Sequence, residues 1–411
     1  MHPPHRMRRS PGSKLAALIA ILAVGWLTLH SEALARPRLT ADSLAAPGPF
    51  AVGITTLTLV DPSRPTAASG AYAGSPVRTL VTDVYYPSTT GGRGAPLDPS
   101  GGPFPLLVFA HGLGGARTNF AATLTHLASR GYVIVAPDFP LTGLVNFLTG
   151  TVSLADLANQ PGDVSFEIDT FTGSGAPAGA PFAAAVDRAR VGLLGHSYGG
   201  GTVMLSVFGG PLADPRVRAA AAAAPFSCPF GSDMFRGRKL PFLILHGTSD
   251  LIVDPAWSLE TFAFMPAPKL LIDIVGGDHL GFVSDPTIPA FRDTDVLPLF
   301  TTVLQSGLPG GQLAQFAALA AALSVVPGAD PARCVQRPPL PDPSAPRDPL
   351  LAHDQQLRIT DVALTAFMDA FVRRDGAARR FILGFRRRAR FGSAVRVCKV
   401  THGRRTCRSP R

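Results

Sequence analysis

The chain has 411 residues, of which 46% are hydrophobic and 16% are charged. This length allows one large buried core with insertions or a tail. Recurring apolar runs, such as PLLVFA at 105–110 and PFLILH at 241–246, exclude a disordered chain. The net charge of +10 is concentrated in residues 373–411, which hold 14 Lys or Arg and one Asp, whereas residues 36–372 are acidic on balance.

This uneven charge predicts a solvated, mobile basic end that is attracted to anionic envelope polymers or membranes. It does not predict nucleic-acid binding, which is not expected of an exported chain that contains no recognition motif. The high pI therefore describes the end of the chain and says nothing about a site in its body.

The first 35 residues have the pattern of a signal peptide. A basic start precedes the apolar run at 15–29, and Ala33-Leu34-Ala35 follows as a small-residue cleavage pattern. The apolar run is shorter than the ~20 residues that a membrane-spanning helix needs. We therefore predict a secreted protein, extracellular or in the cell envelope, cleaved near Ala35. An uncleaved anchor is the alternative.

Export gives the four cysteines a structural meaning. An even number in an oxidising compartment favours two disulfides, for which three pairings exist. We favour Cys398–Cys407, a short loop near the end of the chain, together with Cys228–Cys334. The spacing of the cysteines does not resemble a zinc site, which would need two closely spaced ligand pairs.

The predicted elements begin with two half-buried strands at 50–60 and 77–86, where apolar and polar residues alternate as in an antiparallel pair. The pattern then changes at 105–110, a continuous apolar run typical of a strand buried on both faces of a parallel sheet. Residues 118–131 place apolar side chains at helical spacing and end at Gly131.

Strands and helices continue to alternate downstream. We predict strands at 132–137, 190–197, 216–224, 240–247 and 269–277, and helices at 181–189, 198–210, 256–265 and 357–374. This alternation predicts an α/β fold, a mostly parallel doubly wound sheet with an antiparallel N-terminal edge and inserted loops.

Two long stretches, residues 140–180 and 283–355, interrupt the alternation. Such stretches are either lids and substrate-shaping loops or decorative insertions. The predicted organisation is therefore a leader at 1–35, one α/β domain at 36–375 with these insertions, and a basic Arg-rich tail at 376–411.

The most specific motif is Gly195-His196-Ser197-Tyr198-Gly199, a G-x-S-x-G sequence. It lies between a predicted apolar strand and a helix of small residues, where a sharp turn would expose the serine hydroxyl above the sheet. The two glycines fit because side chains would clash in so tight a turn. This context indicates a nucleophilic Ser197.

A serine nucleophile needs a base and an acid that follow it along the chain in the order acid, then histidine. Asp250 follows the strand at 240–247, and Asp254 is a second candidate there. His279 follows the strand at 269–277. We expect His279 to accept the serine proton and Asp250 to orient the imidazole and stabilise its charge.

The remaining histidines have simpler interpretations. His196 lies within the serine turn, and His111 and His246 end strands in His-Gly turns, so we expect structural or supporting roles. His126 lies on a predicted helix, and His353 follows no strand. His279 alone satisfies order, strand end and spacing together.

Acyl transfer also needs fixed donors for the oxyanion. One candidate is the backbone N–H of Tyr198, directly after the nucleophile. The other is Leu113, in the loop that follows the strand at 105–110. A flexible glycine turn is the alternative interpretation of that loop.

Several segments resemble the platelet-activating factor acetylhydrolase-like lipases and esterases: VGITTLTLVDPSRP, TDVYYP, FAHGLGGARTNF, LASRGYVIVAPDFP and DRARVGLLGHSYGG. Cutinase-like polyester hydrolases and dienelactone hydrolase-like proteins are neighbouring resemblances. The similarity covers residues 50–282 and the last long helix. It implies the α/β-hydrolase fold and ester hydrolysis through an acyl-serine without a cofactor. Ser197, His279, Leu113 and Tyr198 match the family's positions.

The acid departs from the animal acetylhydrolases, whose aspartate comes one strand earlier, in the region of Asp233 here. Cutinase-like enzymes use the position of Asp250. The sequence thus predicts a secreted serine ester hydrolase for short-chain or lipid-like esters. The alternatives are a serine peptidase or thioesterase and, in another class, a non-catalytic envelope-binding protein whose basic tail does the binding.

Overall fold

A computed structural model describes residues 39–173, 182, 184–337, 340–342, 345–401 and 404–408. The predicted signal peptide, 1–35, lies outside these residues. The chain divides into two units, Met1–Leu39 and Thr40–Arg411, and the second holds all the helices and strands described below. In the part of the chain that is described, no helix combines the length and the apolar character that crossing a bilayer requires.

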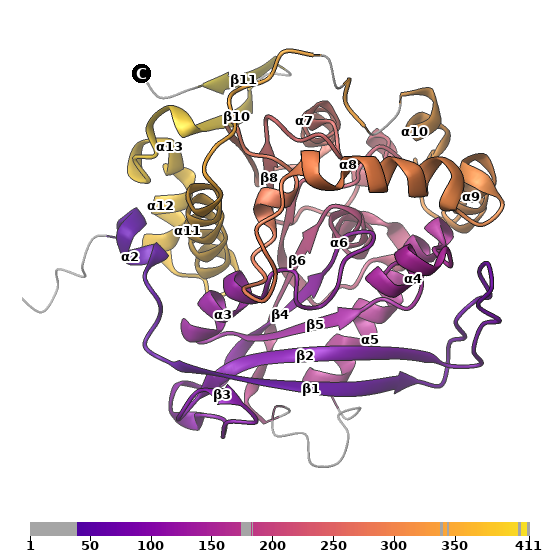
Figure 1. Ribbon diagram of the computed structural model, residues 1–411. Helices are drawn as coiled ribbons and strands as arrows, with labels where there is room; N and C mark the ends of the chain where they lie inside the picture. The colour runs from indigo at the N-terminus through magenta and orange to yellow at the C-terminus, as the bar shows by residue number, and fades with distance from the viewer. Residues whose placement is uncertain are drawn as a thin grey trace, which may run out of the picture. The chain divides into compact units, whose positions relative to one another are not determined.

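One sheet runs through the described residues, in the strand order β11-β10-β9-β8-β7-β6-β4-β5-β2-β1-β3 (Figure 1). The six central strands, from β9 to β5, are mutually parallel. The strands that flank them, β10 and β2, pair with them antiparallel, as do β11 with β10 and β1 with β2, whereas the two-residue β3 pairs parallel with β1. The strands are β1 (Ala51–Asp61), β2 (Arg78–Ser88), β3 (Gly92–Arg93), β4 (Phe104–Ala110), β5 (Val133–Asp138), β6 (Val186–His196), β7 (Val217–Ala223), β8 (Phe242–Gly247), β9 (Lys269–Ile274), β10 (Val395–Thr401) and β11 (Arg404–Arg408).

Helices cover the central strands because these strands are apolar on both faces. Every residue of β4 is buried, as the sequence FPLLVFA requires. The main helices are α3 (Ala121–Ser129), α5 (Gln160–Thr172), α6 (Tyr198–Phe208), α7 (Pro255–Phe264) and α11 (His353–Phe371). The last packs so closely on β6 that a Cβ at Gly192 would lie 2.9 Å from Cγ2 of Val372. The predicted doubly wound sheet with an antiparallel N-terminal edge is confirmed.

The helix that connects β5 to β6 lies at a different place along the chain from the helix that the sequence predicts there. It is α5, which lies within the predicted insertion 140–180 together with α4 (Leu144–Thr149). The helix predicted for 181–189 falls partly outside the described residues, and β6 begins inside that range at Val186. The physical reason is that α5 buries Asp163 and Glu167 beside Val164, Ile168 and Phe171, so polar residues interrupt its apolar face.

The basic C-terminal region also differs from the solvated, mobile tail that its charge predicts. After α11 the chain forms α12 (Gly376–Leu383) and α13 (Phe385–Arg388), and β10 then pairs antiparallel with β9. Apolar residues between the arginines explain this, because Phe381, Phe385 and Val395 are buried. The arginines dominate the net charge, whereas these apolar residues determine the packing.

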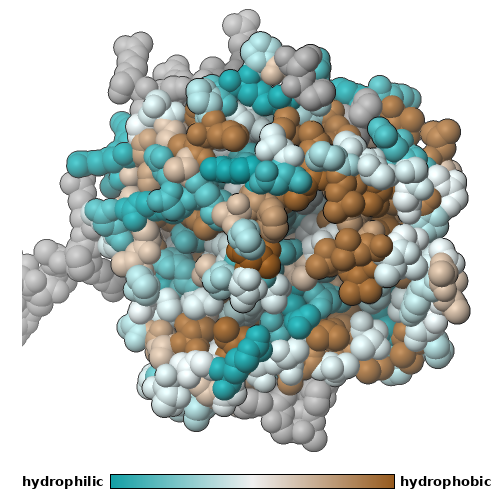
Figure 2. All heavy atoms as spheres, in the orientation of Figure 1, coloured by the Kyte–Doolittle hydropathy of each residue, from teal (hydrophilic) through white to brown (hydrophobic). Residues whose placement is uncertain are grey.

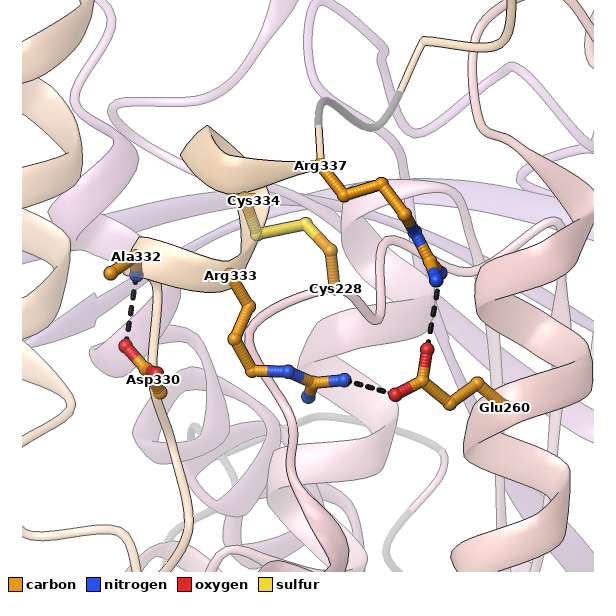
Figure 3. The surroundings of a disulfide bond; sticks show 7 residues. All are labelled: Cys228, Glu260, Asp330, Ala332, Arg333, Cys334 and Arg337. Atoms are coloured by element: carbon orange, nitrogen blue, oxygen red, sulfur yellow. Dashed lines mark hydrogen bonds and ion pairs between the residues drawn. A yellow bond between two sulfur atoms is a disulfide. The ribbon is translucent and has the colours of Figure 1, made fainter.

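The second insertion, 283–355, contains α8 (Asp293–Thr302), the π-helical turn η6 (Val303–Gly307), α9 (Gly311–Ala322) and α10 (Ala332–Gln336). A disulfide between Cys228 and Cys334 joins α10 to the segment after β7, as predicted (Figure 3). Beside it, Arg333 and Arg337 both form ion pairs with Glu260 of α7. The disulfide and these ion pairs therefore attach the insertion to the core at α10.

The second predicted disulfide ends at Cys407, whose side chain lies outside the described residues. The backbone places Cys398 directly opposite Cys407 in the antiparallel pair of β10 and β11. A short helix, α2 (Ala41–Ala45), precedes the first strand of the sheet.

Candidate active site

The serine of the G-x-S-x-G motif lies where β6 ends and α6 begins. Ser197 has φ 54° and ψ −120°, a strained conformation for a residue other than glycine. Its N–H donates to the carbonyl of Ala223 on β7, at 2.9 Å, which fixes the turn against the neighbouring strand. The backbone thus has the geometry of a nucleophile elbow.

The glycines around Ser197 are required by close packing. A Cβ at Gly199 would lie 2.1 Å from the carbonyl oxygen of Ala110, and one at Gly195 would lie 2.4 Å from the carbonyl oxygen of Gly199. A Cβ at Gly112 would lie 3.0 Å from Cβ of Ser197. The glycine loop after β4 therefore passes directly beside the serine.

A buried acid–histidine pair lies in the loops that follow β8 and β9. His279 donates its Nδ1–H to Oδ2 of Asp250 at 2.7 Å, and both side chains are buried. Oδ1 of Asp250 accepts the N–H groups of Ile252 and Val253 at 2.8 and 2.7 Å. Since Ser197 and His279 line the same cavity, the structure brings all three predicted residues into one region.

The charges of this pair stabilise each other. Burial opposes ionisation of Asp250, but His279 and His246 together hold the pKa of the carboxyl well below its usual range. Burial also opposes the imidazolium form of His279, yet Asp250 raises the pKa of His279 above its usual value. The acid is therefore ionised at neutral pH, and the histidine is a stronger base than a free imidazole.

The other acidic candidates are engaged elsewhere. Asp254 accepts the N–H of Ala256 at 2.8 Å and caps the start of α7. Asp233 lies exposed in the turn η4 (Ser232–Phe235) and pairs with Arg236 at 2.9 Å. Asp250 is thus the predicted acid that contacts His279.

The histidines near the site have structural contacts, as expected for those in strand-end turns. His196 donates Nε2–H to the carbonyl of His279 at 3.2 Å, and burial holds its pKa well below the usual value. His111 bridges the carbonyl of Gly112 and the N–H of Phe139. His246 contacts Asp250 at 3.2 Å and so supports the acid.

Two backbone N–H groups flank the serine without hydrogen-bond partners. Among the described residues, neither Leu113 nor Tyr198 donates its N–H to another group. Leu113 and Ser197 line both cavities of the site, and Tyr198 lines the smaller. These are the two donors that the sequence predicts.

Asp293, at the start of α8, was not found by reasoning from the sequence. Its carboxylate accepts the N–H groups of Leu251, His279 and Leu280 at 2.7, 2.9 and 2.8 Å. Burial raises the pKa of Asp293 to about 6, helped by the negative charge of Asp250 and opposed by His279. The signal for it in the sequence was weak, because an aspartate at a helix start is common for other reasons.

Two cavities meet at Ser197. The larger, of about 350 Å³, is lined mainly by apolar side chains from the glycine loop, α4, α8 and the loops that follow β8 and β9. These side chains are Leu113, Leu144, Phe147, Leu148, Ile252, Leu280, Val283, Ile288, Phe291, Val296, Leu299 and Phe300. Figure 2 shows hydrophobic side chains gathered between α4 and α8. The smaller, of about 40 Å³, lies between Tyr198 and the side chains of Leu304 and Phe316. In the described part of the chain, no cluster of side chains suits a metal ion.

Comparisons with known proteins agree with this arrangement. Residues 70–140 match the family model for platelet-activating factor acetylhydrolase, isoform II, and residues 107–302 match the α/β hydrolase family. The platelet-activating factor acetylhydrolase of Cavia porcellus is 22% identical over 263 residues. That alignment covers 53% of this chain and 56% of the relative, so the chain spans just over half of the relative's length.

A solved structure shares the fold. The ferulic acid esterase from Streptomyces cinnamoneus superimposes with a TM-score of 0.54 at 21% identity, covering 81% of this chain and 93% of that one. At this level of identity the likeness shows the fold alone. The chain therefore has the α/β-hydrolase fold, and its sequence resembles the platelet-activating factor acetylhydrolases.

Proposed function

We propose that the protein is a serine carboxylic-ester hydrolase. The observation that carries this proposal is the buried 2.7 Å contact between His279 and Asp250, in a cavity that Ser197 also lines. Two further features support it, the strained elbow at Ser197 and the two unpaired N–H groups beside it. Together these supply a nucleophile, a base, an acid and an oxyanion site.

The proposed reaction has two acyl-transfer steps. His279 takes the proton of Ser197 as the oxygen attacks the ester carbonyl, and the N–H groups of Leu113 and Tyr198 hold the oxyanion. The imidazolium, paired with Asp250, then protonates the leaving alkoxide and leaves an acyl-serine. Water, deprotonated by the same imidazole, hydrolyses that ester to the acid and restores Ser197. No cofactor takes part in these steps.

The cavities support short-chain acyl esters with a larger apolar alcohol part. A water-sized group needs about 10–15 Å³ of such space, so the smaller cavity holds about three or four of them. That is room for an acetyl to butyryl chain. The larger cavity is apolar and accepts a lipid-like or aromatic alcohol group.

We also propose that the protein is exported. The leader with its cleavage pattern lies outside the described residues, but the Cys228–Cys334 disulfide supports an oxidising compartment. N-terminal sequencing of protein recovered outside the producing cells tests this, with a first residue just after Ala35 expected. An intact leader on the recovered protein would contradict it.

The enzymatic proposal is tested with a fluorophosphonate probe, which labels an activated serine. Wild-type protein should be labelled at Ser197 and Ser197→Ala should not. Ser206→Ala is the matched control, because Ser206 lies on the same helix α6 and its hydroxyl donates to the carbonyl of Thr202, away from the other proposed site residues. Failure to label wild type, or equal labelling of Ser197→Ala, contradicts the proposal. Comparison of kcat/KM on an alkyl ester, an amide and a thioester of the same acyl group then distinguishes an esterase from a peptidase or thioesterase.

A further inference from the structure

The acid and base loops of the site are bonded to each other near their starts, where the N–H of Ser249 donates to the carbonyl of Gly277 at 2.8 Å. Farther along the loops, the positions of Asp250 and His279 must match within a fraction of an ångström. Asp250 follows β8 and His279 follows β9. The single carboxylate of Asp293 reaches both loops. It accepts an N–H from Leu251, next to the acid, and N–H groups from His279 and Leu280.

From this geometry we propose that Asp293 is a positioning residue, which holds the Asp250 loop, the His279 loop and helix α8 in one fixed arrangement. Charge-assisted bonds to a carboxylate are roughly twice as strong as those between neutral groups. Asp293 is also buried, so water does not compete for its oxygens. Three such bonds at one carboxylate join the two loops next to the acid and at the base, in addition to the backbone bond between Ser249 and Gly277.

Asp293 lies on the face of α8 that also lines the larger cavity. Asp293, Val296 and Phe300 follow one another at three- and four-residue spacing, so they lie along one side of α8. Val296 and Phe300 line the larger cavity. A shift of Asp293 would therefore move the wall of the larger cavity as well as Asp250 and His279.

Burial and the charge of Asp250 raise the pKa of Asp293 to about 6, so the carboxyl is still mostly ionised at neutral pH. The carboxylate faces Asp250, which opposes its charge, and His279, which favours it. Asp278, the neighbour of His279, is paired instead with Arg292, at 3.4 Å, just before α8. Arg292 also donates to the carbonyl of Leu351, which fixes the start of the helix independently of Asp293.

The test compares Asp293→Asn and Asp293→Ala with the control Asp295→Asn. Asp295 is exposed on the same helical turn and accepts only the N–H of Arg292, at 2.8 Å, so its loss disturbs α8 without touching either loop. Circular dichroism establishes that each variant is folded. The direct readout is hydrogen exchange at the amides of Leu251, His279 and Leu280, because these N–H groups are the bonds in question.

We expect both Asp293 variants to exchange these three amides at least about tenfold faster than wild type, with Asp295→Asn unchanged. The inference rests on the proposed function for its catalytic readout, which is kcat per fluorophosphonate-labelled site on nitrophenyl acetate. That value should fall by about ten- to a hundredfold in Asp293→Asn, as for a misplaced catalytic group.

Unchanged exchange in a folded Asp293→Ala, or an equal effect of Asp295→Asn, overturns the inference. An Asp293 variant that has fewer labelled sites but an unchanged kcat per site also overturns it, because Asp293 would then serve folding only. If wild type hydrolyses no ester, the proposed function fails, but the exchange comparison still decides the role of Asp293.

Discussion

Phe300 of α8 stacks on Phe147 of α4, with ring centroids 5.8 Å apart and planes 21° apart. The two helices belong to the two insertions that interrupt the regular strand–helix order, so this stack joins them over the serine. Phe300 lines both cavities, and Phe147 lines the larger. The insertions are therefore walls of one substrate site and not separate decorations.

Acyl-chain selectivity should depend on Phe316 of α9, which lines the smaller cavity. Replacing Phe316 with Ala removes the ring and enlarges the space beside Ser197. We expect the optimal acyl length in a nitrophenyl ester series to increase by two or more carbons, measured as kcat/KM. Leu313→Ala is the control, because Leu313 is 72% exposed on the same helix. An identical acyl profile in wild type and Phe316→Ala contradicts the assignment of the acyl pocket.

The identity of the acid is settled by comparing Asp250→Asn with Asp233→Asn. An amide at position 250 cannot stabilise the imidazolium and favours the wrong tautomer of His279, so kcat should fall by about 10⁴. The exposed Asp233 contacts only Ser232 and Arg236, and its replacement should change kcat less than twofold. Comparable losses in the two variants would exclude the proposed assignment.

The pH dependence of kcat/KM should reflect the raised pKa of His279. The base must be neutral to take the serine proton, so activity is lost as the pH falls through the pKa of the imidazole. Burial lowers this pKa, but Asp250 and the carboxylates of Asp293 and Asp278 raise it by more. We expect half-maximal activity on the acid side above pH ~6.5, the value for a free histidine. A midpoint below that value would contradict the charge arrangement described.

Glu167 of α5 should make stability fall with rising pH. It is fully buried, accepts one hydrogen bond from Thr82 and leaves Oε2 without a partner. Burial raises the pKa of Glu167 to about 8. Because the folded state holds this proton more tightly than the unfolded chain, its contribution is complete at acidic pH and is lost as the pH rises toward 8.

The matched variant is Glu167→Gln, which cannot ionise. Relative to wild type, we expect its free energy of unfolding to improve by about 1.4 kcal/mol per pH unit between pH ~5 and 8. Urea denaturation at several pH values measures this difference. A gap between the two proteins that stays constant with pH would contradict it.

The sequence reveals the residues whose roles follow from local patterns. Ser197 lies in a five-residue motif between a strand and a helix, and Asp250 and His279 each follow a buried strand in the expected order. Asp293 is different, because its partners are backbone groups of residues 13 to 42 positions away in the sequence. Nothing in the side chain types signals such a contact.

The two misjudged segments have the same kind of explanation. Helix α5 packs polar residues inward among its apolar ones, where Asp163 pairs with the buried Arg78 and Glu167 bonds to Thr82, so its apolar pattern is interrupted. In the C-terminal region, the arginines outnumber the buried apolar residues of α12 and β10, so the charge conceals the packing. Tertiary pairing decided both segments, and only the structure contains that information.

The disulfide between Cys228 and Cys334 encloses both Asp250 and His279, with α8 and α9, in a loop of 106 residues. In a chain-entropy model, closing a loop of this length restricts the unfolded chain by about 4–5 kcal/mol. The enclosed segment holds the acid, the base and much of the substrate wall, whereas Ser197 lies outside it. Protein made in a reducing cytoplasm would lack this restraint, so recombinant production should be directed to an oxidising compartment.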